Sequence, residues 1–82
     1  MYSSVIQGGI HMYNKISEVG KRIQKLRMQN NMTQSKLANK LGIDRTTLAH
    51  YEMGKRTPGI DILWEIADIF GVSVDELIGR DE

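Results

Sequence analysis

Apolar residues recur at the spacing of one helical face along most of this 82-residue chain. The first such stretch predicts a helix from about Lys15 to Asn30. Its buried stripe comprises Ile16, Val19, Ile23 and Leu26. A later stretch predicts a helix from about Ile60 to Phe70. Its core face comprises Leu63, Ile66, Ala67 and Phe70. Ser73 and Glu76 then have the spacing of a capping box, which predicts a short last helix through Ile78.

The stretch from Thr33 to Gly54 predicts two shorter helices joined by a tight turn. Thr33 can cap the first of them with its hydroxyl, and Gly42 can end it because glycine takes positive φ without a Cβ penalty. Asp44 is placed to cap the second helix, which Gly54 ends. The inward residues of the pair are Leu37, Ala38, Leu41, Leu48 and Tyr51. Nothing in the chain indicates a strand, so we expect an all-α fold.

The second helix of this pair has an outward face whose residues are not explained by burial in the core. Its residues are Arg45, Thr46, Ala49 and His50. These side chains are hydrogen-bond donors and small groups. A short exposed helix of this kind on a basic scaffold is what reading a DNA major groove requires.

The charges divide the chain into a basic half and an acidic half. From Glu18 to Arg56 there are nine Lys/Arg and three Asp/Glu, a net charge of +6. From Thr57 to Glu82 there are one Arg and seven Asp/Glu, a net charge of −6. Because the basic half coincides with the helix pair, we interpret it as a surface for a polyanion. The simpler interpretation is that the charges serve solubility alone.

The helix pair and the loop after it resemble the helix-turn-helix of the phage repressor and Cro family, also called the Xre family. The residues that carry the resemblance are Thr33-Gln34, Leu37-Ala38, Leu41-Gly42, Tyr51-Glu52, Gly54-Lys55-Arg56 and Pro58. The resemblance covers roughly Ser17 to Gly79 and implies a compact five-helix, lambda repressor-like DNA-binding domain. It implies a sequence-specific regulator that binds double-stranded DNA, a repressor acting as a homodimer on an inverted-repeat operator. Small domains of this family also act as antitoxins, so an antitoxin that binds a toxin protein and its own promoter is the alternative.

We expect the DNA sequence to be read by Arg45, Thr46, Ala49 and His50. An arginine in the first turn can donate two bonds to guanine O6 and N7, and a threonine can bond either way or touch a thymine methyl. Thr46 and His50 are four residues apart and therefore share a face. The alternatives are a merely solvated Arg45 and a metal-binding His50, which has no second ligand nearby in the sequence.

Phosphate contacts are expected from Gln34, Thr47, Lys55 and Arg56. The family uses the loop of the last two residues for the DNA backbone. Gln34 begins a helix, where free amides and the helix dipole favour phosphate, or it is an ordinary surface residue. Met53 departs from the family, which often has an asparagine there to bond a phosphate. Methionine cannot donate, so one expected backbone contact is missing.

Two further sets of residues are expected to hold the domain and its dimer together. The resemblance implies an ion pair between Arg27 and Glu52, with an exposed, solvated arginine as the alternative. The homodimer interface is expected at Trp64, Ile69, Val74, Leu77 and Ile78. For Trp64, three roles stay open: a dimer contact, core filling, or a contact with another protein such as a toxin or an anti-repressor.

The length and composition of the chain indicate its domain organisation and the compartment in which it works. We expect a helix-turn-helix domain at residues 14–79 and an acidic tail at 80–82. Residues 1–13 are interpreted as a flexible arm, which is a natural segment, a cloning leader before Met12, or a segment that packs on a partner subunit. The absence of cysteine fits a reducing cytoplasm. The family resemblance implies a bacterial or phage-encoded protein that is nucleoid-associated when bound to DNA.

No run approaches the ~20 apolar residues of a membrane span, and the first fourteen residues lack the Lys or Arg of a secretory leader. No nucleophile–base pair, phosphate loop or pair of carboxylates suggests an enzyme. We therefore expect neither a cofactor nor a metal.

Overall fold

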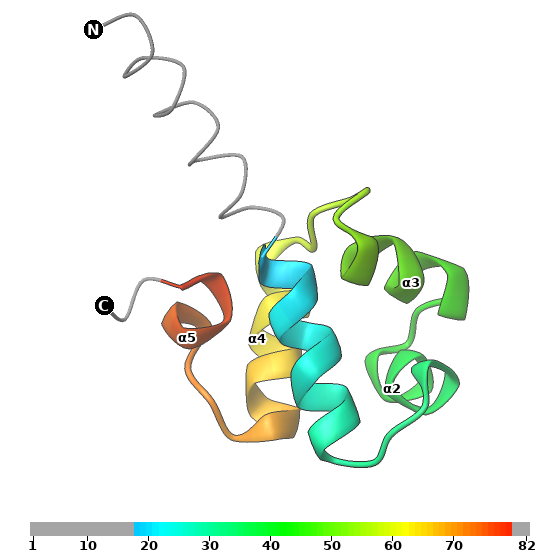
Figure 1. Ribbon diagram of the computed structural model, residues 1–82, viewed down its shortest axis with the longest axis horizontal. Helices are drawn as coiled ribbons and strands as arrows, with labels where there is room; N and C mark the ends of the chain where they lie inside the picture. Colours follow the sequence, from blue (N-terminus) through cyan, green and yellow to red (C-terminus); the bar gives the residue numbers. More distant parts are fainter. Residues whose placement is uncertain (1–17, 80–82) are drawn as a thin grey trace, which may run out of the picture.

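Five helices follow one another in the computed structural model, which describes residues 18–79. The N-terminal helix is described over residues 18–29 and is followed by α2 (Gln34–Leu41), α3 (Arg45–Met53), α4 (Ile60–Phe70) and α5 (Val74–Ile78). The described part contains no strand, as predicted. The N-terminal helix crosses in front of α4, with α2 and α3 on one side and α5 on the other (Figure 1). The predicted start of that helix, with Ile16, lies outside the described residues, as do the expected arm and acidic tail.

The helix ends follow the capping residues of the sequence. The Thr33 hydroxyl accepts from the Lys36 amide at 3.1 Å, and α5 begins with the predicted capping box of Ser73 and Glu76. Gly42 and Gly54 end α2 and α3 at φ of 70° and 78°, where a Cβ would be strained. The left-handed turn after α2 redirects the chain into α3, so this glycine sets the geometry of the helix pair.

The cap predicted for Asp44 is only half correct. Asp44 occupies the N-cap position of α3 in extended conformation, and its carbonyl oxygen accepts from the Leu48 amide at 3.1 Å. Its side chain makes no capping hydrogen bond. Asp44 is exposed, so water can solvate its carboxylate without help from the helix. The Asp44 side chain therefore leaves the first amides of α3 uncapped.

The helices share one apolar core. Its buried residues are Val19, Ile23, Leu37, Ala38, Leu41, Leu48, Tyr51, Leu63, Ile66, Ala67 and Leu77. Leu26 and Phe70 are partly buried against them. Every described residue that the periodicity placed inward therefore belongs to the core or its edge. No described helix is long and apolar enough to cross a membrane.

The structure distinguishes between the roles that were open to two side chains of the expected dimer interface. Trp64 is 60% exposed, so the interpretation as core filling is wrong. The inward side of α4 is already occupied by Leu63, Ile66 and Ala67. Leu77 is 1% exposed, because α5 packs back onto the core and turns this residue inward. Leu77 thus closes the core and cannot offer its side chain to a partner subunit.

Gly20 sets the distance between the N-terminal helix and α3. A Cβ at this buried position would lie 2.9 Å from the Glu52 carbonyl oxygen and closer still to that of Tyr51. Glycine in a helix interior costs about 1 kcal/mol relative to alanine. Here its missing side chain lets the N-terminal helix lie directly against the last turn of α3. This contact fixes how far α3 stands out from the domain.

Candidate nucleic-acid interface

The residues of α3 divide between an inward and an outward face as the sequence predicted. Leu48, Tyr51 and Glu52 are buried, whereas Arg45 and Thr46 are exposed and Ala49 and His50 are partly exposed. Positions four residues apart lie one above the other on a helix. The first two turns therefore present an arginine, a threonine, a methyl group and an imidazole to the outside.

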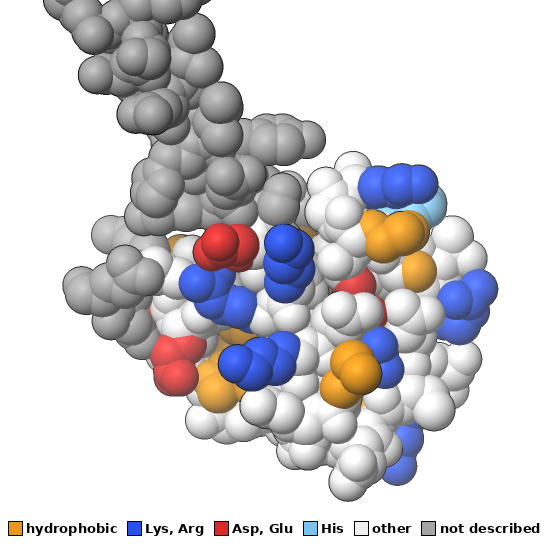
Figure 2. All heavy atoms as spheres, in the orientation of Figure 1, with side chains coloured by type: hydrophobic (Ala, Val, Ile, Leu, Met, Phe, Trp, Pro, Cys, Tyr) orange, Lys and Arg blue, Asp and Glu red, His pale blue; other side chains and the backbone are white. Residues whose placement is uncertain are grey.

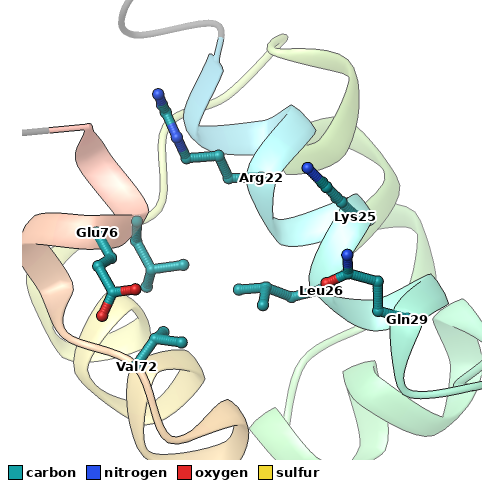
Figure 3. A pocket seen from close by; sticks show the side chains of 7 residues that line it. Arg22, Lys25, Leu26, Gln29, Val72 and Glu76 are labelled. Carbon is teal, nitrogen blue, oxygen red and sulfur yellow. The ribbon is translucent and has the colours of Figure 1, made fainter.

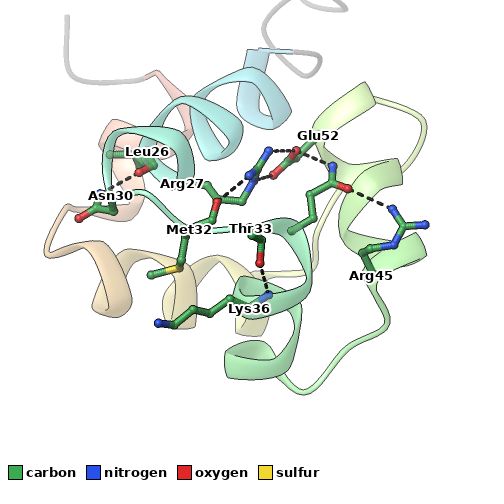
Figure 4. Close-up of polar contacts among 9 residues, drawn as sticks. Leu26, Arg27, Asn30, Met32, Thr33, Lys36, Arg45 and Glu52 are labelled. Carbon is green, nitrogen blue, oxygen red and sulfur yellow. Dashed lines mark hydrogen bonds and ion pairs between the residues drawn. The ribbon is translucent and has the colours of Figure 1, made fainter.

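An ion pair behind α3 connects it to the N-terminal helix. Arg27 donates from Nε to Glu52 Oε2 at 2.7 Å and from Nη2 to Glu52 Oε1 at 3.2 Å (Figure 4). Its Nη1 donates to the Met32 carbonyl oxygen at 2.7 Å. The side chains of Arg27 and Glu52 are only 11% and 1% exposed, so both charges are largely removed from water. The alternative of an exposed, solvated arginine is wrong.

Gln34 extends this ion pair to the outward face of α3. Its Nε2 donates to Glu52 Oε1 at 3.0 Å, and its Oε1 accepts from Arg45 Nη1 at 3.1 Å. The side chains of Arg27, Glu52, Gln34 and Arg45 thus form one continuous chain of hydrogen bonds (Figure 4). We call it the Arg27–Arg45 chain. The interpretation of Gln34 as an ordinary surface residue is wrong, because both ends of its amide are used within the protein.

The basic loop after α3 is anchored to the end of that helix. The backbone amides of Lys55 and Arg56 both donate to the His50 carbonyl oxygen, at 2.9 and 3.3 Å. This holds two exposed cations just beyond the last turn of α3. Met53, which ends the helix, is 59% exposed beside them. Thr47 is partly buried and follows the two exposed residues that begin α3.

Exposed cations also lie along this side of the molecule. Figure 2 shows Lys and Arg side chains, and the one described histidine, along the edge that α2 and α3 form. The exposed lysines of α2, Lys36 and Lys40, add to this field. A positively charged edge attracts a polyanion over several ångströms, and added salt weakens this attraction.

Two elements of this interface were missed from the sequence. Gly20 stood inside an amphipathic pattern, and a glycine at such a place often has a packing reason. The hydrogen bond between Gln34 and Arg45 joins residues eleven positions apart on two helices, so no local spacing indicates it. Within residues 18–79, no group of three or more histidine and acidic side chains is arranged to hold a metal.

Comparison with known proteins agrees with this geometry. The helix-turn-helix family profile matches residues 23–77. The regulator ImmR of Bacillus subtilis is 38% identical over 64 residues, which cover 78% of this chain and 50% of ImmR. The phage CTXphi transcriptional repressor RstR of Vibrio cholerae is 36% identical over 63 residues, or 77% of this chain and 56% of RstR. The transcriptional activator BcrR of Enterococcus faecalis is 37% identical over 65 residues, or 79% of this chain and 32% of BcrR.

The chain thus spans about half the length of ImmR and RstR and about a third of BcrR. The profile match covers α2, α3 and α4, all but the last residue of α5, and the N-terminal helix from residue 23 onward. Together with the all-helical fold, it shows that this chain belongs to the Xre-type helix-turn-helix family of DNA-binding regulators.

Proposed function

We propose that this chain is a sequence-specific repressor that binds an inverted-repeat DNA operator as a homodimer. The observation that carries the proposal is the Arg27–Arg45 chain. A long arginine side chain on a helix surface loses much rotamer freedom when it binds a base. The hydrogen bond that Arg45 donates to Gln34 reduces that loss, because it holds Arg45 in place before DNA arrives.

The outward face of α3 supplies the base contacts in this proposal. Arg45 uses one N–H for Gln34, and its fork of five donors leaves enough for guanine O6 and N7. Thr46 and His50 lie on the adjoining row of the helix and contribute hydrogen bonds, while the Ala49 methyl contacts a thymine methyl. All four side chains are at least partly exposed.

Phosphate contacts position the helix and carry no sequence information. We assign them to Lys55 and Arg56 at the end of α3, to Thr47, and to Gln34. The amide of Gln34 has two N–H donors and gives one to Glu52, so the other can reach a phosphate at the start of α2. The uncapped first amides of α3 beside Asp44 add to this.

Dimerisation is proposed because one small module contacts too little DNA for tight, specific binding. The apolar surface for it lies on α4 and α5. Trp64 is 60% exposed, and Ile60, which was not among the residues expected in the dimer interface, is 62% exposed. The two lie four residues apart on α4 and therefore form one patch. Ile69, Val74 and Ile78 are partly exposed. Half-site centres are then expected about one helical turn apart, roughly 34–36 Å.

Repression is the direction that the RstR comparison favours, since that relative is named a repressor. A dimer on an operator within a promoter represses by occupying the site. BcrR, in contrast, is named an activator.

The test compares a base-reading residue with a phosphate-contacting one. Operator sites are first selected from random duplexes, and affinity for operator and scrambled duplex is then measured over a salt series. Arg45→Ala should cost roughly 1–3 kcal/mol on the operator, relax one base position and change scrambled binding little. Lys55→Ala should weaken both duplexes alike and lower the salt slope by about one unit.

Lys40→Ala is the matched control, because it removes an exposed cation from α2 outside the proposed contacts. An unchanged operator-to-scrambled ratio in Arg45→Ala would show that α3 does not read sequence through this residue. If the wild-type protein binds no duplex, the antitoxin or another protein-binding function replaces this one.

The dimer is tested separately by sedimentation. Trp64→Glu should shift the protein to a monomer and its footprint to single half-sites, because a charge in the apolar patch opposes burial. A wild-type protein that stays monomeric at high concentration would contradict this part of the proposal.

A further inference from the structure

A half-open hollow lies between the N-terminal helix and α5. It measures about 210 Å³ and is lined by Arg22, Lys25, Leu26, Gln29, Val72, Glu76 and Leu77. We call it the α5 groove. Leu26 and Val72 point into it from the two sides, with Lys25 and Gln29 along one rim and Glu76 on the other (Figure 3). An apolar cavity of about 150 Å³ is enough to hold a benzene ring. The α5 groove can therefore accept one large apolar side chain.

The lining of the α5 groove has two cations, Arg22 and Lys25, and one carboxylate, Glu76. A second hollow adjoins it and shares Arg22 and Lys25, and is further lined by Glu18 and Lys21. Glu76 Oε1 already accepts from the Ser73 amide and hydroxyl in the capping box. Glu18 lies 3.4 Å from Arg22 Nη2. Over the two hollows together, three cations lie beside two carboxylates, which leaves a net charge of +1 beside an apolar floor.

Arg22 gives a second, independent indication of a ligand. Its Nη1 is buried and makes no hydrogen bond in the structure. A buried donor without an acceptor costs about 1–3 kcal/mol, and native proteins contain few of them. The guanidinium packs over Gly79 at the end of α5, where a Cβ would meet Nη2 at 2.8 Å. The Arg22 side chain as a whole is 33% exposed, so a rotation of its guanidinium would bring this N–H to an added acceptor such as a carboxylate.

We propose that the α5 groove binds an acidic segment of a partner protein. One large apolar side chain of that segment enters the hollow, and a neighbouring carboxylate reaches Arg22 and Lys25. The charge of the groove selects an acidic partner, and the size of its floor selects a large apolar anchor. The N-terminal helix separates the groove from α3 (Figure 1), so a partner can bind while α3 faces DNA. This proposal does not depend on the proposed operator binding.

The experiment uses the full chain with labelled methyl groups and three short capped peptides as probes. The first peptide is Ala-Glu-Phe-Glu-Ala, the second replaces both glutamates with glutamine, and the third replaces phenylalanine with alanine. The methyl signals of Leu26, Val72 and Leu77 should shift with the first peptide. The second peptide, which lacks both carboxylates, should bind about two- to fivefold more weakly than the first. The third peptide, which lacks the aromatic anchor, should bind about tenfold more weakly than the first.

Variants locate the binding site. Arg22→Gln and Lys25→Gln should each weaken the first peptide about two- to fivefold, as expected for exposed charge pairs. Val72→Phe should abolish the methyl shifts by filling the hollow while leaving both cations in place. Lys36→Gln is the matched control on α2 and should leave peptide binding unchanged. The melting temperature of each variant shows whether it is folded, and a destabilised Val72→Phe leaves the two charge variants to decide.

Four results would overturn the proposal. Equal affinity for the glutamate and glutamine peptides would exclude recognition of the carboxylate. Tighter binding of 3-phenylpropionate than of the peptide would assign the groove to a small carboxylate. Methyl shifts that depend on protein concentration alone would assign it to a second copy of this chain. Shifts of the same methyl groups on addition of duplex DNA would assign the cationic rim to nucleic acid.

Discussion

Replacing Glu52 with alanine should destabilise this domain far more than any change on the outward face of α3. The Glu52 carboxylate accepts hydrogen bonds from Arg27 at 2.7 and 3.2 Å and from Gln34 at 3.0 Å. In the variant, Arg27 retains only its bond to the Met32 carbonyl oxygen. The Arg27 side chain is 11% exposed in the parent protein, so the variant leaves a largely buried charge without a counter-ion. Removing one partner of such a pair costs about 3–5 kcal/mol.

That loss is large for a domain of this size. Small domains have stabilities of about 5–15 kcal/mol, and each 1 kcal/mol lowers Tm by roughly 4–8 °C. Glu52→Ala should therefore lower Tm by roughly 12–40 °C. Thermal unfolding followed by circular dichroism measures this, and urea denaturation gives the corresponding free energy of unfolding.

Three variants separate the stranded charge from other causes. Glu65→Ala removes an exposed glutamate from α4, and Arg45→Ala removes the far end of the Arg27–Arg45 chain. Both should stay within about 0.5 kcal/mol of the parent, as surface substitutions do. Glu52→Gln keeps the shape and one acceptor, so its loss should be intermediate. Equal Tm values for Glu52→Ala and Glu65→Ala would show that the Arg27–Glu52 ion pair is not desolvated.

Three more changes test how α3 is positioned and what it contacts. Gly20→Ala should destabilise the domain by about 1–3 kcal/mol, because the added Cβ would meet the backbone of α3. Gly59→Ala is the control and should be nearly neutral, since its Cβ meets only the end of a side chain. Equal Tm values for the two variants would refute the close approach of the helices. Gln34→Ala should relax specificity at the Arg45 base pair in a binding-site selection, and an unaltered consensus would show that Arg45 needs no tether. Met53→Asn should tighten operator and scrambled duplex alike by a phosphate contact worth about 0.5–1.5 kcal/mol, and a gain on the operator alone would make this position a base reader.

The helices and their ends were determined by the sequence itself. The period of apolar residues placed α4 at Ile60–Phe70, as observed, and the capping residues Thr33 and Ser73 start α2 and α5. These features depend on neighbours within one or two turns, and local chain geometry is nearly the same in every fold. The resemblance to the Xre family added the pairing of Arg27 with Glu52, which no local spacing implies.

Other features depended on how the helices pack. Gly20 became significant only when the last turn of α3 was placed against it. Leu77 is withdrawn from the expected dimer interface because α5 folds back onto the core. Gln34 was expected to contact phosphate or to be an ordinary surface residue, yet it connects Glu52 to Arg45 across two helices. Each of these depends on distances between segments far apart in the chain. Such distances are set by the whole core, because a close-packed interior allows few relative positions of its helices.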